Sequence, residues 1–308
     1  MAKCFSFTMF RDKAYRHTFT SADLKSSTTD FGDGTTMHCW IPQTHCQSMP
    51  SILLIHGFGA NATWQWSEQL RPLLQANYNV YVPDLLFFGD SYTTRPERSE
   101  SFQAQCVMRL MESLGVRRMS LVGVSYGGFV SYSMAAQFPS AIEKVVLCCA
   151  GVCLEEKDLG EGLFVVKDLD EAASILVPQT PDRLRQLMRL SFVKPARGIP
   201  SCFLSDFIDV MCTDFVKEKK ELIQAILKER SCSNLPKIHQ PTLIIWGEKD
   251  QIFPVELAYR LHRHLEGNSE LVIIKNTGHA FNLEKPKEFS KHLKAFLVDS
   301  QVRNSKMD

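Results

Sequence analysis

The sequence lacks a long apolar run, an excess of charge of either sign and any Cys-x-x-Cys pair. No stretch approaches the roughly 18 apolar residues that a membrane-spanning helix needs. The 35 basic and 34 acidic side chains give a formal net charge of +1, so there is no basic surplus with which to bind nucleic acid phosphates. We therefore expect neither integral membrane association nor a nucleic acid partner.

Metal and disulfide frameworks are also missing from the pattern. The ten cysteines include Cys148, Cys149 and Cys153, which fall in or just after an apolar run. This placement favours buried, reduced thiols over zinc ligands or disulfides. The first residues, Met1 to Lys13, have no apolar core followed by small residues and do not resemble a signal peptide. These features predict a protein of the cytoplasm without a bound metal.

Apolar runs alternate with helix-like segments along most of the 308 residues. Strands buried on both faces and separated by helices are typical of a mostly parallel sheet with helices on both faces. The predicted strands are Ile52–Ile55, Tyr78–Val82, Met119–Val124, Val145–Cys149, Thr242–Trp246 and Leu271–Ile274. The predicted helices are Trp66–Gln75, Ser101–Leu114, Gly128–Phe138, Val255–Leu265 and Pro286–Val298.

The same pattern divides the chain. Residues 1–27 have weak periodicity and are predicted to form an amino-terminal arm, followed by a hairpin over Thr28–Pro42 that turns at Asp33-Gly34. Residues 28–152 and 239–300 form the predicted α/β core. Residues 153–238 contain helical spacing but no buried strand, which indicates an inserted helical cap, and residues 301–308 form a polar tail.

One segment carries the chemistry. In Gly123-Val124-Ser125-Tyr126-Gly127, a serine stands between glycines where a strand meets a helix. This spacing is typical of a nucleophile elbow, in which a Cβ at either glycine would collide with the neighbouring strand or helix. Helix N–H groups then point at the serine. We predict that Ser125 is a nucleophile.

A serine nucleophile needs a base near neutral pKa and a carboxylate that orients the base. His279 follows a predicted strand within Asn276-Thr277-Gly278-His279, whereas His262, His264 and His292 lie on helical patterns and are predicted to be surface residues. Asp250 follows the predicted strand Thr242–Trp246. The chain order of nucleophile (Ser125), acid (Asp250) and base (His279) is one in which such triads are known to occur. Glu248 remains the nearest alternative acid. Asp84 and Asp90 are interpreted as loop and helix-cap residues.

A glycine-containing loop, His56-Gly57-Phe58-Gly59, follows the strand that precedes it. The backbone N–H of Phe58, together with that of Tyr126, is predicted to form an oxyanion hole. The ring of His56 is predicted to hold this loop rather than to take part in catalysis.

Together, these motifs resemble the α/β-hydrolase fold superfamily in its cap-bearing branch, over roughly Thr28 to Val298. The overall likeness is to plant cytosolic hydrolases similar to monoacylglycerol lipases and to meta-cleavage product hydrolases. The resemblance implies an acyl-enzyme route with Ser125, His279 and Asp250, with no metal or organic cofactor. Ser125 stands where epoxide hydrolases and haloalkane dehalogenases of the superfamily have an aspartate.

Other departures rank the possible reactions. Meta-cleavage enzymes have an asparagine before the nucleophile, a tryptophan after the histidine and a cap arginine, and here Val124, Ala280 and Phe207 stand at those places. Ester hydrolysis is therefore preferred to carbon–carbon hydrolysis, which stays as an alternative. A small-molecule receptor that retains a slow triad is the alternative from another class.

The expected substrate is a small ester with a largely apolar acyl or alcohol part, since Leu85-Leu86-Phe87-Phe88 adds apolar surface near the site entrance. Part of the apolar set in the cap is expected to line an acyl pocket, and the rest to pack the cap helices together. The candidates are Phe192, Phe203, Phe207, Ile208 and Met211.

Overall fold

A nine-stranded sheet forms the centre of the protein in a computed structural model that describes residues 6–227 and 230–299. In sheet order, the strands are β1 (Leu24–Asp30), β2 (Thr35–Pro42), β4 (Asn79–Pro83), β3 (Ser51–Ile55), β6 (Met119–Val124), β7 (Ile142–Cys148), β8 (Thr242–Gly247) and β9 (Ser269–Ile274). A short strand, β5 (Tyr92–Thr93), pairs with β2. The predicted tail at 301–308 lies outside the described residues.

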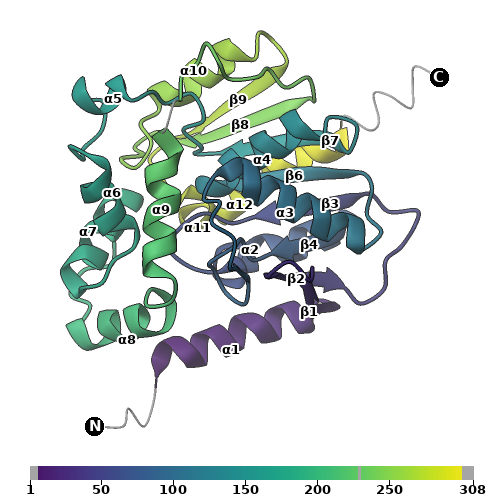
Figure 1. The fold of residues 1–308 in the computed structure, drawn as a ribbon, viewed down its shortest axis with the longest axis horizontal. Helices are drawn as coiled ribbons and strands as arrows, with labels where there is room; N and C mark the ends of the chain where they lie inside the picture. The colour runs from purple at the N-terminus through teal and green to yellow at the C-terminus, as the bar shows by residue number, and fades with distance from the viewer. Residues whose placement is uncertain (1–5, 228–229, 300–308) are drawn as a thin grey trace.

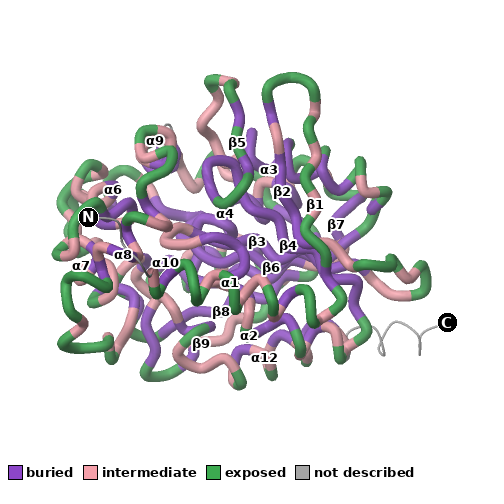
Figure 2. The backbone as a smooth tube through the Cα atoms, turned by 90° about the horizontal axis from the view of Figure 1, so that it is seen from below, coloured by how far each residue is buried: buried purple, intermediate pink, exposed green. Residues whose placement is uncertain are grey.

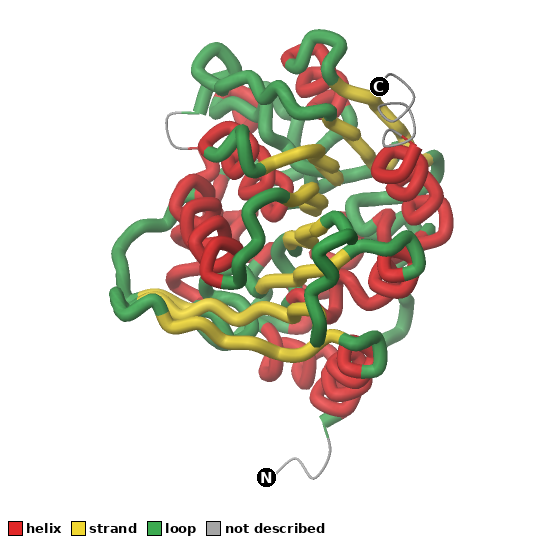
Figure 3. Tube along the Cα trace, turned by 90° about the vertical axis from the view of Figure 1, so that its right-hand side faces the viewer, coloured by secondary structure: helices red, strands yellow, loops and turns green. Residues whose placement is uncertain are grey.

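β4, β3, β6, β7, β8 and β9 run parallel to one another, whereas β2 pairs antiparallel with β1, β4 and β5. β3, β4, β6 and β8 are buried at every position, because helices cover both faces of a parallel sheet. Figure 3 shows helices on either side of the strands. The predicted fold class, a mostly parallel α/β sheet, is confirmed.

The helices of the sheet region connect successive strands or follow the last one. α3 packs against α4, and α2 packs against α12. Their bounds are α2 (Ala62–Leu74), α3 (Glu100–Ser113), α4 (Tyr126–Gln137), α10 (Glu256–His264), α11 (Phe281–Glu284) and α12 (Pro286–Lys294), with a π-helical turn at Ala295–Asp299. Each of the predicted helices is present with ends shifted by a few residues, and α11 is an element that the sequence did not predict.

The amino-terminal segment is more ordered than predicted. It forms α1 (Phe7–Thr20), whose first turn is capped by the Ser6 hydroxyl accepting from the Met9 N–H. α1 packs against α2 and against α8 (Ser201–Met211). The hairpin strand β1 begins at Leu24, so the predicted boundary at residue 28 falls inside a strand. The helix escaped prediction because its apolar residues do not follow a helical stripe.

Residues between β7 and β8 are helical. Besides α8, they form α5 (Lys157–Gly160), α6 (Leu169–Leu176), α7 (Pro181–Ser191) and α9 (Val216–Leu227). Within the described part of this segment there is no strand. Figure 1 shows α6 to α9 grouped beside one edge of the sheet region. α7 and α8 enclose a small core of their own, formed by Leu184, Leu204, Ile208 and Cys212.

Burial is concentrated along the strands, as the purple tube in Figure 2 shows. Cys148, Cys149 and Cys153 are buried free thiols, in agreement with the sequence pattern. Among the described residues, no helix combines the length and apolar character that a membrane crossing requires.

Candidate active site

Ser125 stands at a sharp turn between β6 and α4. Its φ of 54° and ψ of −122° are unusual for a residue with a side chain. A Cβ at Gly123 would overlap the Gly127 carbonyl, and a Cβ at Gly127 would overlap the Ile55 carbonyl. Both glycines are therefore needed to bring α4 close to β3 and β6, as the elbow motif predicts.

The elbow is fixed by the backbone. Ser125 donates its N–H to the Cys148 carbonyl at 2.8 Å, which joins it to the end of β7. Its own carbonyl accepts from the Gly128 N–H at 2.9 Å. Strain at a residue held this way is typical of functional sites, where the surrounding structure keeps a side chain aimed.

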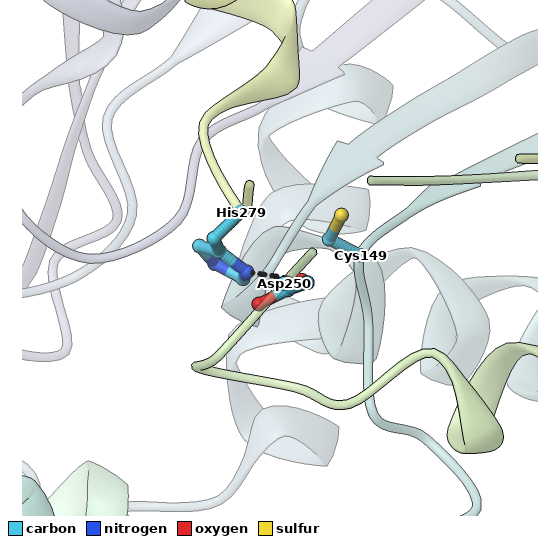
Figure 4. A group of neighbouring side chains, drawn as sticks. All are labelled: Cys149, Asp250 and His279. Atoms are coloured by element: carbon cyan, nitrogen blue, oxygen red, sulfur yellow. Dashed lines mark hydrogen bonds and ion pairs between the residues drawn. The ribbon is translucent and has the colours of Figure 1, made fainter. Parts of the chain in front are cut away.

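Asp250 and His279 lie together past the ends of β8 and β9 (Figure 4). The Nδ1 atom of His279 and the Oδ2 atom of Asp250 are 2.8 Å apart, and the Asp250 carboxylate is fully buried. The other oxygen, Oδ1, accepts from the backbone N–H groups of Ile252 and Phe253. A carboxylate held by two amides can orient an imidazole without moving itself.

The alternative acids have partners other than His279. Glu248 accepts the Asn276 N–H at 2.9 Å and lies exposed. Asp84 is buried, caps α2 by accepting the Ala62 N–H at 2.9 Å, and bonds to His38. Asp90 is exposed and lies 3.7 Å from Arg16. None of these carboxylates contacts His279, so the structure pairs the predicted base with Asp250 alone among the acids considered.

Glu284 was not identified from the sequence. Its carboxylate accepts the Gly278 N–H at 2.6 Å and the Val193 N–H at 3.0 Å. It thus joins the loop that carries His279 to the end of α7. A glutamate five residues after the histidine carries no motif of its own, and only the fold reveals this contact.

Ser125 and His279 belong to the same edge of the sheet but are not directly bonded. Among the described residues, no hydrogen bond joins the Ser125 hydroxyl to the imidazole. Aromatic rings lie close to both residues. The centre of the Phe253 ring is 5.8 Å from that of the His279 ring and 5.7 Å from that of Phe129, which lies in the first turn of α4. Catalytic hydrogen bonds are often long before a substrate binds.

The predicted oxyanion loop lies against the elbow. A Cβ at Gly57 would lie 2.8 Å from the Ser125 Cβ. The Gln65 amide accepts the Gly57 N–H and donates to the carbonyls of Gly57 and Phe58. None of the hydrogen bonds described for this loop uses the Phe58 N–H. The Tyr126 N–H stands in the first turn of α4, where a helix has no internal acceptor.

His56 holds the loop from inside the core. Its Nε2 accepts the Leu85 N–H at 2.9 Å, so its Nδ1 carries the proton and donates to the Gly57 carbonyl at 2.8 Å. Burial lowers the pKa of His56, partly offset by Asp84. A neutral ring that joins the turns after β3 and β4 agrees with the predicted structural interpretation.

The other histidine candidates remain on α10 and α12. His262, His264 and His292 are half-buried rather than solvated as expected. His262 pairs with the Ser269 hydroxyl at 2.8 Å. None contacts Asp250, so they do not compete for the role of base.

Cys149, Asp250 and His279 offer three ligand atoms within 4.8 Å of one another. Burial raises the pKa of the Cys149 thiol well above its usual range, and the nearby Asp250 adds to this effect. A metal would need the thiolate. Because the thiol is held protonated and the imidazole is already bonded to the carboxylate, this group fits a proton-transfer pair better than a metal site.

An apolar cavity adjoins this pair. Among the described residues, it is lined by parts of the helical segment and by Ile252 and Phe253, with Gln251 as the one polar residue of that lining. Ile223 and Leu176, which also line it, pack near Phe58. The cavity therefore extends between the His279 side and the Phe58 side of the site.

The predicted pocket residues lie elsewhere. Phe192, Phe203 and Phe207 line an open groove of about 780 Å³ between α1–α2 and α7–α8, and Met211 lines a neighbouring cavity. Ile208 is buried in the core of α7 and α8. None of these residues lines the apolar cavity beside Phe253, since sequence spacing does not reveal which helix face meets the core.

The fold and the strand-end residues together define an α/β hydrolase. Residues 52–292 match the alpha/beta hydrolase family, which is more than half of the chain, and the chain therefore belongs to this family. Its curated relatives include the monoacylglycerol lipase ABHD6 of Bos taurus, 30% identical over 276 residues, covering 84% of this chain and 79% of that protein. The monoacylglycerol lipase abhd6-A of Xenopus laevis is 31% identical, covering 85% and 80%.

Solved structures give the same picture. A membrane phospholipase A, described as a bacterial virulence factor, has a TM-score of 0.77 and 27% identity over 96% of this chain and 92% of its own. The esterase EaEST from Exiguobacterium antarcticum has a TM-score of 0.73 and 22% identity, covering 88% and 99%, and shows the fold alone. The predicted superfamily and the likeness to monoacylglycerol lipases are confirmed, and the likeness to plant hydrolases stays a prediction.

Proposed function

We propose that this protein is a serine hydrolase that cleaves carboxylic esters through an acyl-enzyme. The observation that carries the proposal is the hydrogen bond between His279 and a fully buried Asp250 at the same sheet edge as the strained Ser125. A base oriented by a carboxylate, at the same sheet edge as a serine on a strained turn, is the arrangement that acyl transfer requires.

Each residue has one task in this mechanism. Ser125 attacks the ester carbonyl while His279 takes its proton, and Asp250 stabilises the imidazolium that forms. The N–H groups of Phe58 and Tyr126 bind the oxyanion of the tetrahedral intermediate. His279 then returns the proton to the leaving alcohol, and water repeats the cycle on the acyl-enzyme.

The apolar substrate preference is supported by the cavity beside Phe253, whose described lining residues are apolar apart from Gln251. The names of the relatives, monoacylglycerol lipases at 30–31% identity, point to the same chemistry. An acyl chain in this cavity would lie between α6 and α9 on one side and Phe253 on the other.

We further propose that residues 153–238 act as a cap. Ala173, Val177 and Ile223 from this segment form a cluster against which Phe58 packs. Helices that close over the oxyanion loop would exclude water from the reacting ester, which strengthens the electrostatic interactions of the site.

The test uses a medium-chain 4-nitrophenyl ester. The wild-type protein should turn over repeatedly, and Ser125→Ala should lower kcat by about ten thousandfold or more. Asp250→Asn should lower kcat by a similar order, because an amide would hold the wrong imidazole tautomer. Wild-type rates in Asp250→Asn would remove this residue from the triad.

The alternatives give different results in the same assay. A single labelling event without product release would favour a receptor. Faster hydrolysis of a vinylogous dienoate than of esters would favour carbon–carbon bond cleavage.

A further inference from the structure

Lys219 is a cation in an unusual place. It lies on α9, within the helical segment, and the residue is 5% exposed. Among the described residues, no hydrogen bond or ion pair involves its ammonium group, which lies 5.0 Å from the centre of the Phe88 ring. Buried charges are normally paired, because desolvation without a partner is costly. A cation–π contact offsets only part of that cost.

The position of Lys219 on α9 places it near the proposed oxyanion loop. Val216, Lys219 and Ile223 fall on one face of the helix, and both Val216 and Ile223 belong to the cluster that includes Phe58. The Phe88 ring that lies under the ammonium is 5.1 Å from the Phe58 ring and 5.1 Å from the His56 ring. One aromatic ring therefore separates the charge from the proposed oxyanion loop.

Lys219 lines a cavity of about 380 Å³, large enough for a small ligand group. Its walls include Phe87, Phe88 and Asn61 from the core, with Val210, Met211 and Phe215 from the helical segment. Residues of α1, among them Lys13 and Arg16, also line it, so the cavity is bounded by α1, by the loops after β3 and β4, and by α8 and the start of α9.

The other charged residues of this cavity have partners or lie in solvent. Asp12 accepts from Arg16 at 2.8 Å and from the Trp64 indole at 2.9 Å. Asp90 lies 3.7 Å from Arg16. Asp214 is exposed at the turn between α8 and α9. Burial lowers the pKa of Lys219, and this shift is opposed first by Cys212 and then by Asp214. Lys219 is the buried cation here whose neighbours do not neutralise it.

We propose that Lys219 binds an anionic oxygen group of the substrate, a carboxylate or a phosphate, and so selects charged esters over neutral ones. This inference rests on the proposed ester hydrolase function and deepens it. The apolar cavity beside Phe253 would hold the acyl chain, and the Lys219 cavity would hold the anion on the other side of the oxyanion loop. A charge-assisted hydrogen bond would replace the cation–π contact as the main partner of the ammonium.

Two matched ester pairs test the proposal and separate the sources of the anion. 4-Nitrophenyl valerate and 4-nitrophenyl hemiglutarate differ by a terminal carboxylate on the acyl part. 1-Oleoylglycerol and 1-oleoylglycerol 3-phosphate differ by a phosphate on the alcohol part. In at least one pair, the wild-type protein should have a higher kcat/KM for the charged ester.

Lys219→Met removes the charge and keeps the length of the side chain. We expect the ratio of kcat/KM, charged over neutral, to fall about tenfold or more in the pair that fits, since a hydrogen bond to a charged group is worth that much. Lys219→Arg should retain most of the ratio. Lys217→Met is the matched control, because it removes a charge from the exposed side of the same helix. An unchanged ratio in Lys219→Met for both pairs would overturn the proposal. It would mean that Lys219 only packs against the Phe88 ring.

Binding separates this inference from the proposed function. In Ser125→Ala, calorimetric titration should show tighter binding of the charged ester than of its neutral partner, and Lys219→Met in that background should abolish the difference. Equal affinities in both pairs contradict the Lys219 site even if Lys219→Met does not fold. Consumption of the esters by Ser125→Ala would instead contradict the proposed nucleophile.

Discussion

At the scale of single residues, the neutral ring of His56 makes stability depend on pH. Burial lowers the pKa of His56, and the lone pair on Nε2 is already used to accept the Leu85 N–H. In the unfolded chain, a histidine takes up a proton near pH 6.5. Below that pH the unfolded state therefore binds more protons than the folded state, so stability falls as the pH falls.

This sign gives a measurable prediction. Between about pH 7.5 and about pH 5.5, the free energy of unfolding should fall by about 1 kcal/mol on account of His56. In urea unfolding, the free energy of unfolding of His56→Gln should not show this part of the decrease, although the variant is less stable at both pH values. His17→Gln, at an exposed position on α1, is the control and should keep the wild-type dependence. An equal fall in His56→Gln and wild type would contradict the assignment.

The sequence predicts the position of a residue best where it follows an apolar strand, although the catalytic roles of these residues stay predictions. Asp250 and His279 each lie in the loop after a strand that the apolar pattern predicts, and parallel strands end at one edge. Glu284 and Lys219 carry no such mark. A glutamate and a lysine on helical patterns are typical of solvated faces, and only packing shows that Lys219 is buried over Phe88.

At the scale of elements, the last residue of β8 controls the distance between two loops. A Cβ at Gly247 would overlap the carbonyl oxygen of Gly278 and lie 2.9 Å from that of Thr277. These are backbone atoms of the loop that carries His279, so they cannot turn aside as a flexible side chain could. Gly247 thus allows the Asp250 and His279 loops to meet.

Gly247→Ala should separate these loops. We expect kcat for the ester to fall about a hundredfold, as a displacement near 1 Å can cost that much, while stability falls by about 1–3 kcal/mol from the overlap. Gly160→Ala in α5 is the matched control, because a Cβ there meets no atom within 4 Å. A Gly247→Ala protein with wild-type kcat would show that the loops can shift without loss of geometry.

Element prediction succeeded for strands buried on both faces and failed at the amino terminus. Met119–Val124 was predicted with the bounds that β6 has, because apolar residues fill it and a turn ends it. α1 was missed because its exposed positions include Phe7, Met9 and Phe10. Its stability depends on contacts with α2 and α8 that lie far away in the sequence.

At the scale of the whole molecule, Trp64 joins three parts of the chain. The centre of its ring is 5.1 Å from that of Tyr15 in α1 and 5.5 Å from that of Phe207 in α8. Its Nε1 donates a hydrogen bond of 2.9 Å to the Asp12 carboxylate. Trp64 itself belongs to α2, in the sheet region. One side chain thus links the amino-terminal helix, the core and the proposed cap.

Trp64→Leu should loosen α1 and α8 together without unfolding the sheet. Each aromatic pair contributes about 0.5–1.5 kcal/mol, so we expect a loss of about 2 kcal/mol in the docking of both helices. Hydrogen–deuterium exchange should rise at Phe7–Thr20 and Ser201–Met211 and stay unchanged at Met119–Val124. Trp64→Phe is the control, since it keeps a ring between Tyr15 and Phe207 and should show a smaller rise. Equal acceleration at β6 would mean that Trp64 stabilises the whole domain, and acceleration at α1 alone would mean that α8 docks independently of the amino-terminal helix.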